Sequence, residues 1–172
     1  MRLVVFDFDD TLYSTSDKKE VDSNLASTIL DTIKNLAKKD TKMYIISNAS
    51  LTWIEQALNS LGLRDIIPMY AEIISVMDQN LQAPVSIWKS IAFHNHLDLG
   101  NAHELIAFGD NVFDREASLN VKKSYPHVIV KNILFLKSPT SPVLVQEHLF
   151  VQDNIDWILN TNSDLDLSIL VG

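Results

Sequence analysis

Aspartate residues follow two short apolar segments of the sequence, and their spacing suits metal-assisted chemistry. Asp7 and Asp9 lie at the end of the apolar segment 3–8, and Asp110 directly follows the apolar segment 105–109. Carboxylates at short range repel one another unless a proton or a cation lies between them. Because hard divalent ions prefer oxygen ligands, the predicted partner of such a carboxylate cluster is Mg²⁺.

Alternating strand-like and helix-like segments predict how these aspartates are positioned. Residues 3–8, 43–47 and 105–109 are apolar at consecutive positions, which is typical of strands buried on both faces of a parallel sheet. Residues 70–76 and a stretch within 128–136 are weaker strand candidates. Apolar residues at helical spacing predict helices within residues 25–36, 53–61, 84–97, 114–121 and 155–159. The order predicts an α/β fold with right-handed crossovers and a parallel sheet of about five strands.

The carboxyl ends of the predicted strands carry further polar residues. Ligands of open parallel sheets bind beyond these ends. Ser47 and Asn48 close the second predicted strand, and Asp114 lies four residues after Asp110, near the start of the next helix. We therefore expect these side chains to converge with the N-terminal aspartates in one crevice.

Composition limits the classes of protein to consider. The 172 residues, 47% of them hydrophobic and 21% charged, suit one globular domain, either complete or the N-terminal part of a longer chain. Zero cysteines exclude disulfides and a cysteine nucleophile. A net charge of -8 argues against nucleic-acid and membrane partners. Asp7 and Asp9 interrupt the N-terminal apolar segment too early for a signal peptide. No apolar run is long enough to span a membrane, so a cytoplasmic or otherwise soluble protein is expected. Residues 138–142 are the one predicted linker.

The residues above resemble the four motifs of the haloacid dehalogenase (HAD) superfamily. Asp-Phe-Asp-Asp-Thr-Leu at residues 7–12 resembles the first motif and Ser47 the second. Lys89, at the start of a predicted helix, is similar to the third, and Asp110 with Asp114 to the fourth. The four occur in the family's order and cover the chain to about residue 115. The resemblance implies a HAD-like Rossmannoid three-layer sandwich and a phosphatase that requires Mg²⁺.

The same resemblance implies a role for each matched residue. Asp7 would be the nucleophile that forms an aspartyl-phosphate, and Asp9 the general acid and then the general base. The implied metal ligands are Asp7, Asp9 through its backbone carbonyl, and Asp110, with Asp114 as a further metal ligand or a supporting group. The implied phosphate-binding set is Thr11, Ser47, Asn48 and Lys89, with Thr11 also helping to position the loop.

The spacing of the motifs leaves no room for the cap domain that many HAD enzymes insert. Residues 13–46 and 48–88 are accounted for by predicted loops, helices and strands, so a single capless domain is expected over residues 1–172, with a small flap at 13–19. Capless members act on phosphoproteins, on nucleic-acid ends, or on small sugars when oligomers complete the site. The chain is similar to the magnesium-dependent phosphatase group, which acts on phosphotyrosine. Alternatives are an oligomeric small-molecule (sugar or nucleotide) phosphatase and a HAD-fold binding or regulatory module with little turnover.

Other polar and aromatic residues have simpler interpretations. Asp10 is interpreted as a loop or helix cap. His94 and His96 are two positions apart on a predicted helix, so they point to different faces and do not form a metal pair. Trp53 and Trp88 fall on apolar helix faces and are predicted to lie in the core.

Overall fold

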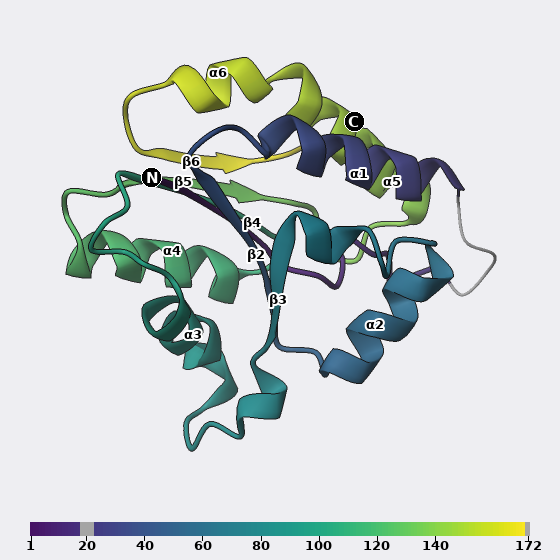
Figure 1. Ribbon diagram of the computed structural model, residues 1–172, viewed down its shortest axis with the longest axis horizontal. Coiled ribbons are helices and arrows are strands. Elements are labelled where there is room, and N and C mark those ends of the chain that lie inside the picture. Colours follow the sequence, from purple (N-terminus) through teal and green to yellow (C-terminus); the bar gives the residue numbers. More distant parts are fainter. Residues whose placement is uncertain (18–22, 171–172) are drawn as a thin grey trace.

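The fold is built on one parallel β-sheet. The structure, a computed structural model, describes residues 1–17 and 23–170 (Figure 1). Its strands are β1 (Arg2–Phe6), β2 (Thr41–Ser47), β3 (Ala71–Ser75), β4 (Glu104–Gly109), β5 (Ile129–Leu134) and β6 (Leu165–Ser168). They form a six-stranded sheet in the order β3-β2-β1-β4-β5-β6, and each neighbouring pair is parallel. The chain starts in the middle of the sheet, runs to one edge and then returns to build the other half, so the strand order reverses between β1 and β4.

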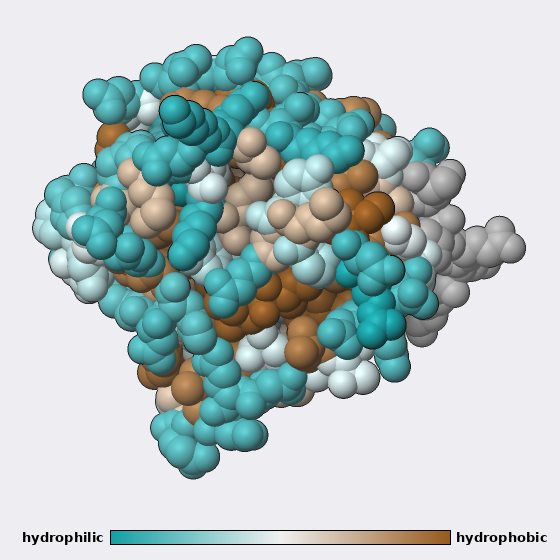
Figure 2. All heavy atoms as spheres, viewed as in Figure 1, coloured by the Kyte–Doolittle hydropathy of each residue, from teal (hydrophilic) through white to brown (hydrophobic). Residues whose placement is uncertain are grey.

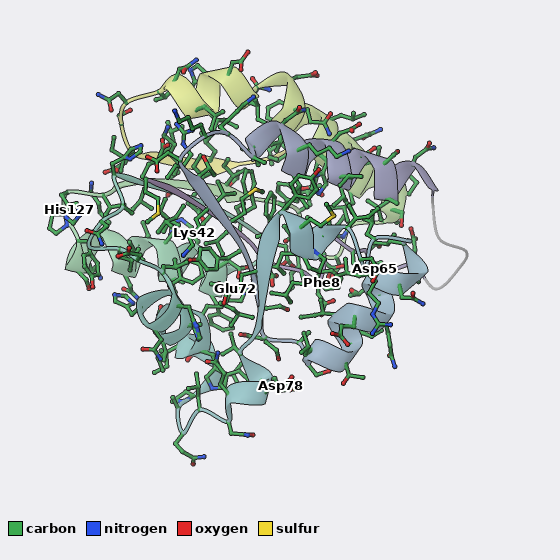
Figure 3. All side chains as sticks on the ribbon, in the orientation of Figure 1. Phe8, Lys42, Asp65, Glu72, Asp78 and His127 are labelled. Atoms are coloured by element: carbon green, nitrogen blue, oxygen red, sulfur yellow. The ribbon has the colours of Figure 1, made fainter. Side chains whose placement is uncertain are left out.

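Helices cover both faces of the sheet and complete a three-layer α/β fold (Figure 1). Residues of α1, α2, α5 and α6 share one core with the sheet, and residues of α3 and α4 share the other. In β1, Val4 enters the first core and Leu3 the second, and side chains fill both layers (Figure 3). Burial on both faces is what a consecutively apolar strand predicts. The α-helices are α1 (Ser23–Leu36), α2 (Leu51–Ser60), α3 (Trp88–His96), α4 (Val112–Ser124), α5 (Ser141–Asp153) and α6 (Ile155–Asn160), and the 3-10 helices are η1 (Ile67–Met69), η2 (Met77–Gln79) and η3 (Val85–Ile87).

The C-terminal third differs from the sequence-based expectation. The sheet has six strands, not about five, because β6 pairs with β5 from Lys131↔Leu165 to Leu134↔Ser168. The connections β4–β5 and β5–β6 advance in the same direction along the sheet, yet their helices lie on opposite faces, so they have opposite hands. The expectation of right-handed crossovers throughout is therefore wrong. On this face α5 and α6 cover apolar side chains of β4 and β5 such as Phe108 and Ile133.

Residues 138–142 are not a linker. Ser141 begins helix α5, and Pro142 occupies the first turn, where its missing N–H costs no hydrogen bond. The hydroxyl of Ser14 donates to the carbonyl of Pro139 at 2.6 Å, and the backbone N–H of Ser141 donates to the Asp17 carboxylate at 2.5 Å. These contacts attach the segment to the loop that follows β1. The predicted flap at 13–19 lies partly outside the described residues.

None of the helices in the described part of the chain combines the length and the apolar character that crossing a membrane requires.

Candidate active site

The predicted site residues meet where the strand order reverses. Beyond the carboxyl ends of β1, β2 and β4 lies a cavity of about 230 Å³. A larger hollow of about 560 Å³ follows the open edge of β3, beside Lys42 and Glu72 (Figure 3), but it touches none of the predicted site residues. The smaller cavity therefore carries the candidate chemistry, and its lining is Asp7, Asp9, Asp10, Ser47, Asn48, Ala49, Lys89, Asp110 and Asn111.

Lys89 is the one ammonium in the lining of this cavity. It lies in the first turn of α3, is 4% exposed, and donates to the Asp7 carboxylate at 2.9 Å and to the Asp114 carboxylate at 2.5 Å. Burial opposes its charge, but the carboxylates of Asp114 and Asp7 raise the pKa of Lys89 above its ordinary value. Lys89 is therefore a fixed cation that holds two of the carboxyl groups together.

Three carboxyl groups lie together in this cluster, and two of them bind the single ammonium. Ligand oxygens of Asp7, Asp110 and Asp114 all lie within 4.8 Å of one another. Burial, together with the hydrogen-bonded carboxyl of Asp7, raises the pKa of Asp110 to about 9. Burial also raises the pKa of Asp114, although Lys89 acts in the opposite direction. The cluster has more carboxylates than cations, and either protons or a bound metal ion can relieve the repulsion.

The start of helix α4 fixes the position of the Asp114 side chain. The Asn111 side chain caps the helix by accepting from the N–H groups of Phe113 and Asp114, and the Asp114 side chain completes the capping box. One Asp114 oxygen accepts from the N–H groups of Asp110 and Asn111 at 3.2 and 3.3 Å, and the other from the lysine. Both oxygens thus have protein partners, which favours the supporting role over direct metal binding. A Cβ atom on Gly109 would lie 2.4 Å from this side chain, so only glycine fits there.

Asp9 lies on the loop beyond β1 and contacts an aromatic side chain. Its Oδ1 accepts a hydrogen bond from the indole N–H of Trp53 at 2.8 Å. Burial raises the pKa of Asp9, and the bond from Trp53 lowers it. Trp53 is 38% exposed, so the prediction that it lies in the core is wrong. Asp10 adopts φ 60° and accepts from the backbone and hydroxyl of Thr15 at 2.9 Å, as expected for a loop cap.

The expected phosphate-binding residues separate into two groups. Ser47 and Asn48 line the cavity, and Asn48 Oδ1 is buried without a hydrogen-bond partner among the described residues. Thr11 is fully buried and does not line the cavity, so it is not placed to contact a phosphoryl group. Its carbonyl accepts from buried His148 of α5 at 2.7 Å, which ties the loop to the helix layer. Thr11 therefore belongs to the support of the loop.

Several contributors to the site were not found in the sequence. Helical spacing predicts a core position for Trp53, although an amphipathic indole at a helix start is a signal for a polar partner. Asn111 three residues before Asp114 is a recognisable cap spacing. His94 and His96 bind different partners, Ser90 and Gln79, as their spacing predicts.

Comparisons with known proteins support the fold alone. No protein-family model and no curated protein matches the chain. Among solved structures, the chain is similar to the Legionella pneumophila effector Ceg4, which was solved with an N-terminal yeast Hog1p sequence. The sequence identity is 13%, the TM-score is 0.55, and the match covers 88% of this chain and 94% of that chain.

Proposed function

We propose that this protein is a Mg²⁺-dependent phosphomonoester hydrolase of the HAD type that acts through an aspartyl-phosphate. The observation that carries the proposal is the Lys89 ammonium 2.9 Å from Asp7, in a cavity that Asp9 and Asp110 also line. A nucleophilic carboxylate, a second carboxyl group for proton transfer and a fixed cation are the groups that phosphoryl transfer needs.

The donor set fits a hard divalent ion. Asp7 and Asp110, with the backbone carbonyl of Asp9, would hold Mg²⁺, because oxygen ligands suit it and the carboxyl groups outnumber the single ammonium. When bound, Mg²⁺ offsets the charge that opposes attack of a carboxylate on a phosphate group. Asp114 would act through Lys89 and through the two backbone N–H groups that it accepts from.

Each remaining step falls to a residue of this chain. A carboxylate oxygen of Asp7 would bond to phosphorus while the bond from phosphorus to the leaving oxygen breaks. Asp9 would give its proton to that leaving oxygen, and then take a proton from the water that attacks the aspartyl-phosphate. Lys89 and Ser47 would bind the phosphoryl oxygens. Hydrolysis releases inorganic phosphate and restores the Asp7 carboxylate and the protonated Asp9.

The surface around the cavity favours a peptide substrate. Exposed apolar side chains lie after the carboxyl ends of β2, β3 and β4 and just before α3. Figure 2 shows apolar surface near the centre of this face, over β3, and smaller apolar areas at its lower left. Exposed apolar residues that follow these strand ends suit a phosphorylated segment with apolar neighbours, above all phosphotyrosine, more than a small sugar phosphate. These exposed residues are Leu51, Trp53, Met77, Val85, Ile87 and Val112.

Hydrolysis of a chromogenic aryl phosphate tests the proposal. We expect turnover with Mg²⁺, none in EDTA and poor support by Ca²⁺, whose coordination is larger and looser. Phosphotyrosine peptides should exceed sugar phosphates and nucleotides in kcat/KM. A much better metabolite substrate, turned over by a stable oligomer, would favour the small-molecule phosphatase. The absence of turnover with every phosphoester and metal would favour the binding module.

A further inference from the structure

The contact between Trp53 and Asp9 joins two elements that the sequence keeps 44 residues apart. Trp53 lies in the first turn of α2, where its backbone N–H is fixed by the Ser50 hydroxyl at 3.2 Å. Its ring stands edge-on to Tyr13 with centroids 5.7 Å apart, and Tyr13 stacks on buried Phe8 at 6.0 Å. The indole is therefore anchored at its backbone and at its ring while its N–H reaches the cavity.

The contact also distinguishes the two oxygens of the Asp9 carboxyl. Among the described residues, Trp53 is the one side chain that hydrogen-bonds to Asp9, and it does so at Oδ1. An indole N–H donates and cannot accept, so it favours Oδ1 as the unprotonated oxygen and leaves Oδ2 to exchange a proton. Lys89 comes from α3, on the opposite face of the sheet from α2. The two sides of the cavity thus carry separate groups, a phosphoryl-binding cation and an oriented carboxyl.

We propose that Trp53 is a positioning residue, whose N–H holds Asp9 with Oδ2 directed at the leaving oxygen of the substrate. This inference rests on the proposed function, in which Asp9 protonates that oxygen. The hydrogen bond at Oδ1 keeps the carboxyl from turning outward to solvent. Leaving groups that need a proton should then depend on Trp53, whereas leaving groups that depart without one should not.

Trp53→Phe tests this inference because it keeps an aromatic ring against Tyr13 and removes only the N–H donor. We expect kcat for phenyl phosphate to fall about 10-fold, part of the 10² to 10⁴ that general acid catalysis contributes, with KM unchanged. For dinitrophenyl phosphate, kcat should change less than about 2-fold by the same reasoning. Trp157→Phe, at another exposed tryptophan, in α6, is the matched control and should change neither.

A second measurement reports the contact without any turnover. In ¹⁵N-labelled protein free of metal, Asp9→Asn should shift the Trp53 indole N–H resonance, and Asp156→Asn in α6 should leave it in place. In an Asp9→Asn background, Trp53→Phe should cause no further loss of kcat. Equal losses for both leaving groups, or an indole resonance indifferent to Asp9, would overturn the inference. Failure of the proposed function looks different, because the wild type would then hydrolyse neither phosphoester while the resonance still moved.

Discussion

Two buried clusters of charged side chains lie at opposite ends of the same sheet. The site cluster, at the carboxyl ends, is Asp7, Lys89, Asp110 and Asp114. The basal cluster, towards the amino ends, is Arg2 of β1, Glu104 of β4 and Lys131 of β5. Both place charges from three distant segments at a distance that allows ion pairing, and both are mostly hidden from solvent.

The basal cluster satisfies its charges internally. Glu104 pairs with both Arg2 and Lys131. The two cations then bind carbonyls near the end of α6, Lys131 at Ile158 (2.5 Å) and Arg2 at Leu159 (3.3 Å). Cations suit the carboxyl end of a helix, where the last carbonyls lack intrahelical partners. The basal cluster therefore ties α6 to the sheet and borders none of the cavities described above.

The site cluster has the opposite character. Its three carboxyl groups lie together with one ammonium, which pairs with Asp7 and Asp114. Asp7, Lys89 and Asp110 line a cavity of about 230 Å³. Like charges that are not balanced and that lie beside a cavity can bind a ligand of opposite charge. A cluster whose charges are already paired, with no cavity beside it, cannot. Charge burial alone does not indicate function, whereas an excess of one sign next to a cavity does.

The largest expected effect is a loss of turnover when a residue of the site cluster is replaced. Asp7→Asn removes the proposed nucleophile, so turnover should fall by at least about 10⁴-fold, as loss of a covalent nucleophile does elsewhere. The melting temperature should not fall, because one of several repelling carboxylates is lost. Steady-state assays and thermal unfolding check both statements. Asp156→Asn is the control, and full activity of Asp7→Asn would refute the assignment.

The basal cluster should respond in the reverse way. Lys131→Met deletes a buried ammonium that binds Glu104 and the Ile158 carbonyl. The free energy of unfolding should fall by about 3 kcal/mol, at the low end for a broken buried pair because Arg2 still pairs with Glu104. Urea unfolding measures the loss, and kcat under folding conditions should be unchanged. A loss of kcat without a loss of stability would contradict the comparison.

Mg²⁺ should stabilise the protein through the site cluster alone. At 100 times its Kd, a ligand that binds only the folded state adds about 2.7 kcal/mol. Asp110→Asn should lose this gain. Without metal and at neutral pH it should be more stable than the wild type, because the raised pKa of Asp110 makes the folded wild type keep a proton that the unfolded chain releases. Thermal shifts with Mg²⁺ and with EDTA check this. An equal Mg²⁺ shift in both proteins would place the metal elsewhere.

A smaller effect tests how closely the site cluster is packed. Gly109→Ala places a Cβ 2.4 Å from the Asp114 side chain, which must then move together with its bond to Lys89. Overpacking of this kind costs about 1–3 kcal/mol, and kcat should fall with it. Gly100→Ala is the matched control, since its Cβ would meet nothing within 4 Å. Urea unfolding and activity assays on both variants test this prediction.

The sequence predicted the site cluster better than the basal one, and the reason is physical. Asp7 and Asp110 each follow a consecutively apolar strand, and a parallel sheet brings such strand ends together. Glu104 and Lys131 sit inside strand segments, where their pairing depends on register and on helix α6. No local periodicity encodes that pairing.

The C-terminal third and the aromatic contact were missed for related reasons. Glu147 and His148 are buried in α5, so the helix lacks a clean apolar stripe and was not predicted as a separate helix. Strand β6 is short and alternates exposed with half-buried residues at the sheet edge. Trp53 has an apolar ring and a polar N–H. The helical spacing of apolar residues predicts burial of the ring and gives no information about the partner of the N–H. Helix α5, strand β6 and the Trp53 contact all depend on tertiary contacts with other elements.

The last expected effect is a pH slope in the metal-free protein. The pKa of Asp110 is raised to about 9 by burial and by Asp7, so the folded state holds this proton more tightly than the unfolded chain. The stability it contributes is full below the ordinary carboxyl range, near 4, and is lost as pH rises towards 9. Its slope cannot exceed about 1.36 kcal/mol per pH unit.

Urea unfolding in EDTA at a series of pH values measures this slope. Two other buried groups titrate in the same range, since burial raises the pKa of Glu147 to about 7 and lowers that of His148 to about 4. Their slopes oppose each other and are common to the wild type and Asp110→Asn, so the difference between the two proteins reports Asp110 together with the carboxyl groups coupled to it. We expect stability to fall more steeply with rising pH in the wild type, and saturating Mg²⁺ to remove the difference in slope by replacing the proton. Parallel curves in EDTA would show that the site cluster carries no excess charge, and would remove the contrast with the basal cluster.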